Sequence, residues 1–158
     1  MTADQFCVFE VAQHYYAVSA TQIREITAKP DFSKAPCSTL MLAGIWHEGS
    51  EFLPVLRMPF QSSISEKESQ VLVIHGQNGR WALLVDQVHN IVPLECSQGN
   101  QGESNEWNAA LQGMSTWKGR PVRVMNLDGL YRLIEAQLQD EWNGTAEALT
   151  GRETLEIN

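Results

Sequence analysis

Apolar residues occur along most of this chain in short runs separated by turn signals, a pattern typical of β-strands. The clearest example is residues 70–94, in which the apolar runs Val71–His75 and Trp81–Val85 flank a Gly-Gln-Asn-Gly loop. Asn-Gly between apolar runs favours a hairpin, because both residues tolerate the positive φ of a primed turn. A third apolar run, Ile91–Leu94, follows. We therefore expect a hairpin that continues into a further strand.

The same pattern predicts two more hairpins and a separate strand. The paired runs are Phe6–Val11 with Tyr15–Ser19, and Leu111–Trp117 with Pro121–Met125. Residues 52–58, FLPVLRM, predict another strand, in which Pro54 lacks a backbone donor and indicates an edge or a bulge. Thr21–Ile26 fits either a helical turn or a bent strand edge. Many short strands at close spacing indicate a mainly β fold of the barrel type.

Helical periodicity is confined to the region after residue 126. Its apolar residues recur at i, i+3, i+4, i+7 and i+11, namely Leu127, Leu130, Tyr131, Ile134 and Leu138. Asn126 is a suitable N-cap, and Asp128 in the first turn suits the helix dipole. Residues 139–158 are polar and acidic, with Gly144 and Gly151 as helix breakers. We expect them to form a flexible tail.

Composition narrows the class of protein. A chain of 158 residues with 43% hydrophobic residues suits one soluble domain. Its net charge of −8 opposes binding to nucleic acid. No apolar run approaches the ~20 residues that span a bilayer, and the N-terminus lacks the pattern of an export signal. We therefore expect a cytoplasmic protein without membrane insertion, whose separated cysteines, Cys7, Cys37 and Cys96, are reduced and structural.

No motif for catalysis, metal binding or a cofactor stands out. His47-Glu48 lacks the second histidine of an HExxH site, so we predict neither a metal nor a cofactor there. Asp86, His89 and Glu95 would be the acidic and imidazole groups of a small hydrolytic or ligand-binding barrel, an alternative without a supporting motif. At the end of a strand, Asp86 more often caps a turn.

Taken together, the pieces resemble the CheW family of bacterial chemotaxis coupling proteins. Phe6–Phe9 is similar to the opening strand of the family, and Ile23-Arg24-Glu25-Ile26 is similar to its V-x-E-I segment. Gly44 and Pro54 keep the Gly-to-Pro spacing of the G-x-x-N-L-R-G-x-x-x-P motif. Residues 84–88, LVDQV, resemble the V-V-D-x-V strand, and residues 124–128, VMNLD, resemble the closing strand and helix.

The resemblance implies two small SH3-like five-stranded β-barrels packed side by side, with a C-terminal helix. We expect a single domain over residues 4–138, with subdomains 4–60 plus 122–138 and 61–121. Members of the family are not enzymes. They couple the cytoplasmic tip of a chemoreceptor to the regulatory domain of a CheA-type histidine kinase, so the resemblance implies an adaptor recruited to membrane-associated receptor arrays.

The resemblance also implies partner-binding residues. Ile23, Glu25 and Ile26 match a receptor-facing family segment, whereas the alternative is that the isoleucines fill a barrel. Val85 and Val88 correspond to the groove between the barrels, with core packing as the alternative for Val85.

The third implied contact segment departs from the family. His47, Glu48 and Gly49 stand where the family has Asn, Leu and Arg, and glycine cannot replace the bidentate contacts of arginine. Arg57 also reverses the sign of the family's aspartate. These departures argue against ordinary receptor docking. They indicate a divergent adaptor, with pilus motility or polar localisation as alternative systems.

Overall fold

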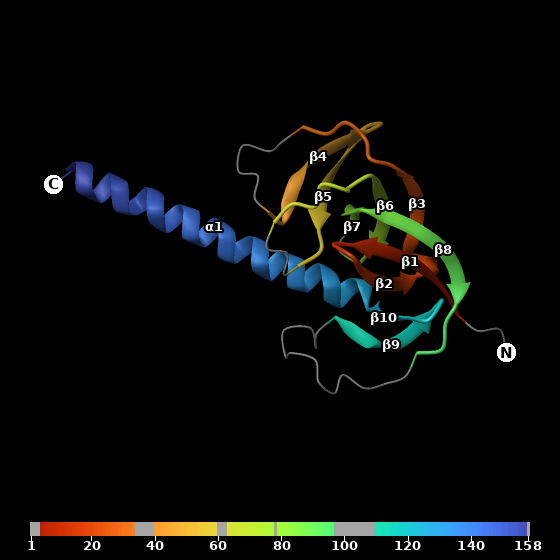
Figure 1. Ribbon diagram of the computed structural model, residues 1–158. Coiled ribbons are helices and arrows are strands. Elements are labelled where there is room, and N and C mark those ends of the chain that lie inside the picture. The colour runs from red at the N-terminus through yellow and green to blue at the C-terminus, as the bar shows by residue number, and fades with distance from the viewer. Residues whose placement is uncertain (1–3, 34–39, 60–62, 78, 97–109, 158) are drawn as a thin grey trace.

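The computed structural model describes residues 4–33, 40–59, 63–77, 79–96 and 110–157. In the C-terminal helix α1 (Leu127–Ile157), the side chains are described as far as Asn143. The elements are two five-stranded sheets, a short 3₁₀ helix η1 (Ala20–Gln22) and α1, which extends away from the sheets (Figure 1).

The first and last strands of the described chain belong to one sheet, here called sheet A. In spatial order it contains β8 (Gln87–Pro93), β1 (Gln5–Val11), β2 (His14–Ser19), β10 (Arg120–Met125) and β9 (Leu111–Trp117). The intervening strands form sheet B, in the order β3 (Ile23–Ala28), β6 (Gln70–Gly76), β7 (Gly79–Val85), β5 (Glu51–Arg57) and β4 (Leu42–Glu48). Sheet B is therefore inserted into sheet A along the chain.

The three predicted hairpins are confirmed as β1–β2, β6–β7 and β9–β10. Their turns use positive backbone φ angles, including Ala12 and Gln13 at 51° and 69° and Gly79 at 106°. The region of Thr21–Ile26 contains both predicted features, since η1 is followed directly by β3. Pro54 is not on an edge strand, because β5 lies between β7 and β4. The parallel ladder with β7 begins only at Val55, so Pro54 lies beside β4 alone.

The predicted subdomain ranges differ from the observed sheets. Residues 4–60 plus 122–138 and 61–121 were expected to form separate units, but β3, β4 and β5 pair with β6 and β7 in sheet B. Two parallel pairings, β2–β10 and β5–β7, join segments that are distant in the sequence. Among the described strands, the end strands of each sheet do not pair with each other. The sheets are therefore open rather than closed barrels.

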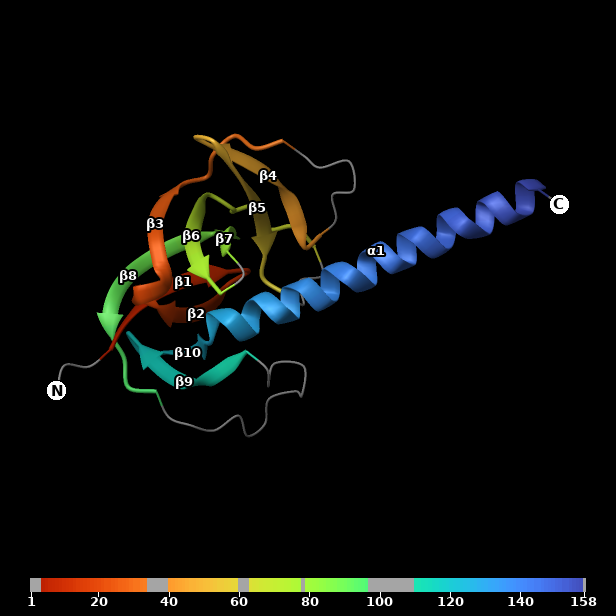
Figure 2. The same ribbon diagram turned by 180° about the vertical axis from the view of Figure 1, so that it is seen from behind.

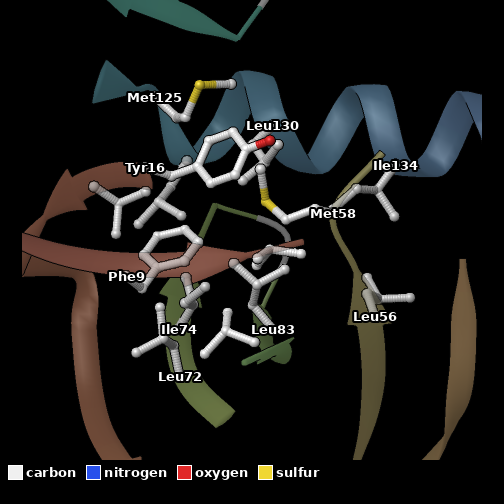
Figure 3. Close-up of a cluster of buried hydrophobic side chains, with 14 of the residues drawn as sticks. Phe9, Tyr16, Leu56, Met58, Leu72, Ile74, Leu83, Met125, Leu130 and Ile134 are labelled. Atoms are coloured by element: carbon white, nitrogen blue, oxygen red, sulfur yellow. The ribbon is translucent and has the colours of Figure 1, made fainter. Parts of the chain in front are cut away.

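The largest hydrophobic cluster lies between the two sheets and under the first turns of α1 (Figure 3). Sheet A contributes Phe9 and Tyr16, whose rings stack with centroids 5.7 Å apart, and sheet B contributes Leu72 and Ile74. Each large side chain buried in this way contributes roughly 1.5–3 kcal/mol. Two smaller clusters cover the other faces of the sheets, one built on Val8 and Val124 and the other on Val55 and Val71. The central cluster therefore joins both sheets and the helix into one unit.

The predicted helical stripe is confirmed at the start of α1. Leu127, Leu130 and Ile134 are buried in the central cluster, and Tyr131 and Leu138 are half-buried against it. The Asn126 cap is also confirmed, since Asn126 Oδ1 accepts the Gly129 N–H at 3.0 Å.

The predicted tail after residue 138 was wrong in its secondary structure. The helix continues to Ile157 and projects beyond the sheets (Figures 1 and 2). A glycine inside a helix costs only about 1 kcal/mol relative to alanine and does not by itself end the helix. In the described part of the chain, no helix combines the length and apolarity needed to cross a membrane.

Candidate partner-binding surfaces

Strand β3 places the first predicted contact segment at the end of sheet B. Ile23 and Ile26 are half-buried against the central cluster, whereas Glu25 is exposed. A register shift between Ile23 and Glu25 produces this arrangement, because it interrupts the alternation of side chains along the strand. The isoleucines therefore contribute to packing and also form part of the surface, with a carboxylate beside them.

Strand β8 adds apolar residues that face the same core. Val88 pairs with Phe9 and Ile91 pairs with Cys7, and both partners on β1 are buried in the central cluster. Because paired residues share a face of a sheet, Val88 and Ile91 also lie on that side. Val88 is half-buried, and Ile91 is 46% exposed.

We call Ile23, Glu25, Ile26, Val88 and Ile91 the inter-sheet margin. Figures 1 and 2 show β3 and β8 on the side of the molecule away from the projecting part of α1. Val85 is not part of this surface. Its exposed fraction is 0%, and its side chain belongs to the central core.

The β4–β5 hairpin carries the second predicted segment. His47 and Phe52 face each other across the two strands, and their rings stack with centroids 4.4 Å apart and an interplanar angle of 13°. The Phe52 side chain is 69% exposed. An exposed stacked pair of this kind offers an apolar contact area at the end of sheet B. We call His47, Glu48, Gly49 and Phe52 the hairpin surface.

The tip of the same hairpin is held by charge and by backbone conformation. Arg80 of β7 forms ion pairs with Glu48 and Glu51, and the Arg80 Nη2–Glu48 Oε2 distance is 3.3 Å. Gly49 has a φ of +62°, a value that favours glycine. Glu48 is therefore already paired within the chain, and Gly49 has a conformational role in the turn.

Gly44 allows a neighbouring segment to cover the outer edge of β4. Ser33 forms a two-bond bridge with Ile45, with N···O distances of 3.0 Å and 2.8 Å. A Cβ atom at Gly44 would lie 2.4 Å from the Ser33 carbonyl oxygen. Packing therefore requires glycine at position 44, the first residue of the Gly-to-Pro spacing, because only glycine permits this close approach of Ser33.

The acidic and imidazole residues of the hydrolytic alternative have separate partners. Asp86 Oδ2 accepts the Ala12 N–H at 3.0 Å and caps the β1–β2 turn. His89 Nε2 donates to Glu10 Oε1 at 2.9 Å, and its ring contacts Tyr15. Among the described residues, no hydrogen bond joins Asp86 to His89 or Glu95, and no group of three potential ligands is placed to hold a metal ion.

Sequence reasoning missed the exposure of two apolar residues and one internal ion pair. Phe52 and Ile91 were correctly assigned to apolar strands, but their exposure at the surface was not predicted. Arg57 was read only as a change of sign, but it is buried in an ion pair with Glu68. Strand register could have revealed the exposed residues, whereas the Arg57–Glu68 pair has no local sequence signal.

Comparison with known proteins assigns the family. The family model described as the CheW-like domain matches residues 5–135. Among solved structures, the chain is similar to the scaffolding protein TtCheW from Thermoanaerobacter tengcongensis, with 16% sequence identity and a TM-score of 0.65. That similarity covers 80% of this chain and 86% of the other, and at this identity it shows a shared fold. No curated protein sequence matches this chain.

The match includes every described strand of both sheets and the first turns of α1. This chain belongs to the CheW-like family, and the family resemblance read from its sequence is confirmed. The predicted mainly β architecture with two five-stranded units and a C-terminal helix is also confirmed, with open sheets in place of closed barrels.

Proposed function

We propose that this chain is a non-enzymatic adaptor that couples a chemoreceptor to a CheA-type histidine kinase in chemosensory signal transduction. The observation that carries the proposal is the CheW-like match over residues 5–135. The site geometry supports it, because the predicted contact residues other than Val85 are exposed or half-buried on β3, on β8 and in the β4–β5 hairpin, and their chemistry suits protein contacts. The proposed place of action is the cytoplasm, at membrane-associated receptor arrays.

The inter-sheet margin is the proposed receptor contact. A receptor tip is a helical structure, and an amphipathic helix binds through apolar residues at i, i+3, i+4 and i+7. Ile23 and Ile26 of β3 and Val88 and Ile91 of β8 supply partly exposed apolar side chains for such a helix, and Glu25 supplies a charge beside them. A charged rim mainly sets specificity and the rate of association, whereas the apolar centre provides affinity.

The hairpin surface is the second proposed contact, and its chemistry differs from that of the family motif. The His47–Phe52 pair stands beside Gly49, where the family carries arginine. Arginine would favour a partner carboxylate, whereas a stacked aromatic pair favours an apolar or aromatic partner. We propose that this surface binds a partner with exposed apolar side chains. The regulatory domain of the kinase is our first candidate.

A divergent adaptor that serves pilus motility or polar localisation is the second candidate function. The observation that favours it is the same replacement of His47–Ser50. It predicts that the chain retains a kinase contact and uses the altered hairpin for a different receptor.

The test is a titration of the full chain with the kinase regulatory domain from the same cell, followed by a receptor-tip protein. Glu25→Arg should weaken receptor binding, and Phe52→Ala should weaken binding at the hairpin, each by about tenfold, which corresponds to ~1.4 kcal/mol. Ile64→Ala is the matched control, because Ile64 is 55% exposed and lies outside both surfaces. It should leave both affinities unchanged.

The outcomes separate the candidates. Binding to both partners supports a chemotaxis coupler, and binding to the kinase domain alone supports the divergent adaptor. Binding to neither partner would contradict the proposed function while leaving the family assignment intact.

A further inference from the structure

The C-terminal half of α1 is a projecting helix whose sequence is poorly suited to helix formation on its own. The helix extends to Ile157, so the part beyond Trp142 is about 22 Å long at 1.5 Å per residue. It projects away from both sheets (Figures 1 and 2). Isolated helices of this length are marginal in water, and Gly144 and Gly151 weaken this one further. A partner surface would supply the missing stabilisation.

The charge of this segment defines the kind of partner that it fits. Residues 139–157 contain five acidic residues and one basic residue, Arg152. The acidic residues are Asp140, Glu141, Glu147, Glu153 and Glu156. Two such helices would repel each other side by side. A basic surface with polar donors is the complementary partner.

The β9–β10 hairpin of the same protein provides such a surface. Lys118, Arg120 and Arg123 are three of the eleven basic residues of this acidic chain, and they lie within six positions of one another. The Lys118 Nζ atom lies 4.7 Å from the Trp117 ring centroid, and the Arg120 guanidinium carbon lies 5.1 Å from that of Tyr15. These cation–π contacts position the two charges at the protein surface.

A pocket lies beside the hairpin, within this basic surface. Its volume is about 280 Å³, and it is lined by Gln13, His14, Tyr15, Met114, Arg120, Pro121 and Arg123. None of the described residues that line it is acidic. Arg120 Nη1 donates to Tyr15 Oη at 2.8 Å, the one hydrogen bond of this side chain within the described part of the protein, and a guanidinium group has further donors that suit a carboxylate.

A protomer cannot fill its own basic pocket with its own helix. Arg120 begins β10 and α1 starts only after that strand ends, so the hairpin turn and the helix start lie at opposite ends of β10. The helix then continues away from the sheets (Figure 1). Any contact between the acidic helix and the basic pocket is therefore a contact between two molecules.

We propose that the acidic C-terminal half of α1 from one copy docks on the basic pocket of the β9–β10 hairpin of a second copy. The contact is head-to-tail, since the two surfaces differ and each copy carries both. Such heterologous contacts form rings or open chains of molecules. The attraction is between exposed charges, so salt weakens it.

Sedimentation of the full chain over increasing protein concentration, at low and at high salt, tests the proposal. Arg120→Glu and the double variant Glu147→Lys/Glu153→Lys should each lower the association constant by at least about tenfold. Lys67→Glu and Glu66→Lys are matched controls, because both residues are exposed and lie outside the two surfaces. Circular dichroism of each variant checks that the fold and helix are retained.

The decisive arm mixes the Arg120→Glu variant with the Glu147→Lys/Glu153→Lys variant. Each should be monomeric alone, but the mixture should form a heterodimer, because the intact acidic helix of the Arg120→Glu variant meets the intact basic pocket of the double variant. Wild-type protein that remains monomeric at low salt up to about 1 mM would overturn the proposal, because a dissociation constant above that concentration is too weak to hold two copies together. Association that persists in Arg120→Glu, or a mixture that remains monomeric, would also overturn it.

Discussion

Arg57 and Glu68 form an ion pair inside the protein, with Arg57 Nε donating to Glu68 Oε2 at 2.7 Å and with 8% and 4% of their side chains exposed. Arg57 Nη1 also donates to the Leu40 carbonyl at 3.1 Å. The arginine therefore ties the end of β5 to the segments that lead into β4 and β6. A residue that reads in the sequence as a change of surface charge is thus an internal link.

Removal of either partner of this pair should strongly destabilise the fold. Glu68→Ala leaves a buried guanidinium without its carboxylate, and the free energy of unfolding should fall by about 3–5 kcal/mol. Urea denaturation measures this change. Glu51→Ala is the control, because its ion pair with Arg80 is exposed and should be worth less than about 1 kcal/mol. A loss at Glu68 no larger than at Glu51 would contradict the structural role of the pair.

Asp86 should stabilise the junction between the two sheets. It lies between β7 of sheet B and β8 of sheet A, its N–H donates to the Glu10 carbonyl at 3.0 Å, and its carboxylate caps Ala12. Asp86→Ala leaves the Ala12 N–H without this acceptor, so we expect a loss of about 1–3 kcal/mol in the free energy of unfolding. Thermal and urea unfolding measure it. The exposed neighbour Gln87, changed to alanine, should unfold like the wild type.

Local signals predicted the hairpins and the helix start, because their contacts are close in sequence. The φ > 0 residues of a turn and the Asn126 cap act within a few residues, and the sequence shows both. The division into sheets depends instead on the parallel pairings of β2 with β10 and of β5 with β7. Apolar patterning specifies which face of a strand is buried but not which distant strand pairs with it.

The residues of the two candidate surfaces could be predicted from the sequence only in part, for the same reason. Ile23, Glu25, Ile26 and Val88 were found through the family resemblance, and the structure places them on strands that border the central core. Phe52 was missed, because an aromatic residue at the start of an apolar run reads as core. The side on which it lies follows from its pairing with His47.

Burial of Cys7 should make protein stability depend on alkaline pH. Desolvation raises the pKa of the Cys7 thiol from 9.0 to about 11. The unfolded chain therefore loses this proton first as the pH rises. The contribution of the thiol is fully present below pH 9 and is lost progressively between pH 9 and pH 11.

Cys7→Ala should therefore show a shallower loss of stability over pH 9–11 than the wild type. Burial and Glu135 also raise the pKa of Tyr131, but this effect is present in both proteins, so their difference isolates Cys7. Urea unfolding at several pH values measures it. Equal slopes for the two proteins would contradict the assignment. As a second readout, a thiol reagent should label half-buried Cys96 much faster than Cys7 in the folded protein.

Gly49 and Gly44 should respond differently to the same substitution. A Cβ atom at Gly49 meets nothing within 4 Å, so Gly49→Ala should cost only the backbone strain at φ +62°, about 1 kcal/mol. Gly44→Ala should cost more, about 3 kcal/mol, because the added atom would lie 2.4 Å from the Ser33 carbonyl oxygen. Urea unfolding of the two variants tests this difference. Similar losses would contradict the close approach of residues 32–33 to β4.

Substitution at Gly49 allows the effect on stability to be measured separately from the effect on partner binding. Gly49→Arg has open space for its side chain, so it should fold with a loss of about 1 kcal/mol. Replacement of His47–Ser50 by Asn-Leu-Arg-Gly also places arginine at the position with φ +62°, so it should lose a similar amount of stability. Under the second candidate function, the divergent adaptor, the altered hairpin selects the receptor, so this four-residue variant should bind an ordinary receptor tip more tightly than the wild type in a direct titration. A stable variant with unchanged receptor affinity would show that the hairpin is not the element that selects the receptor.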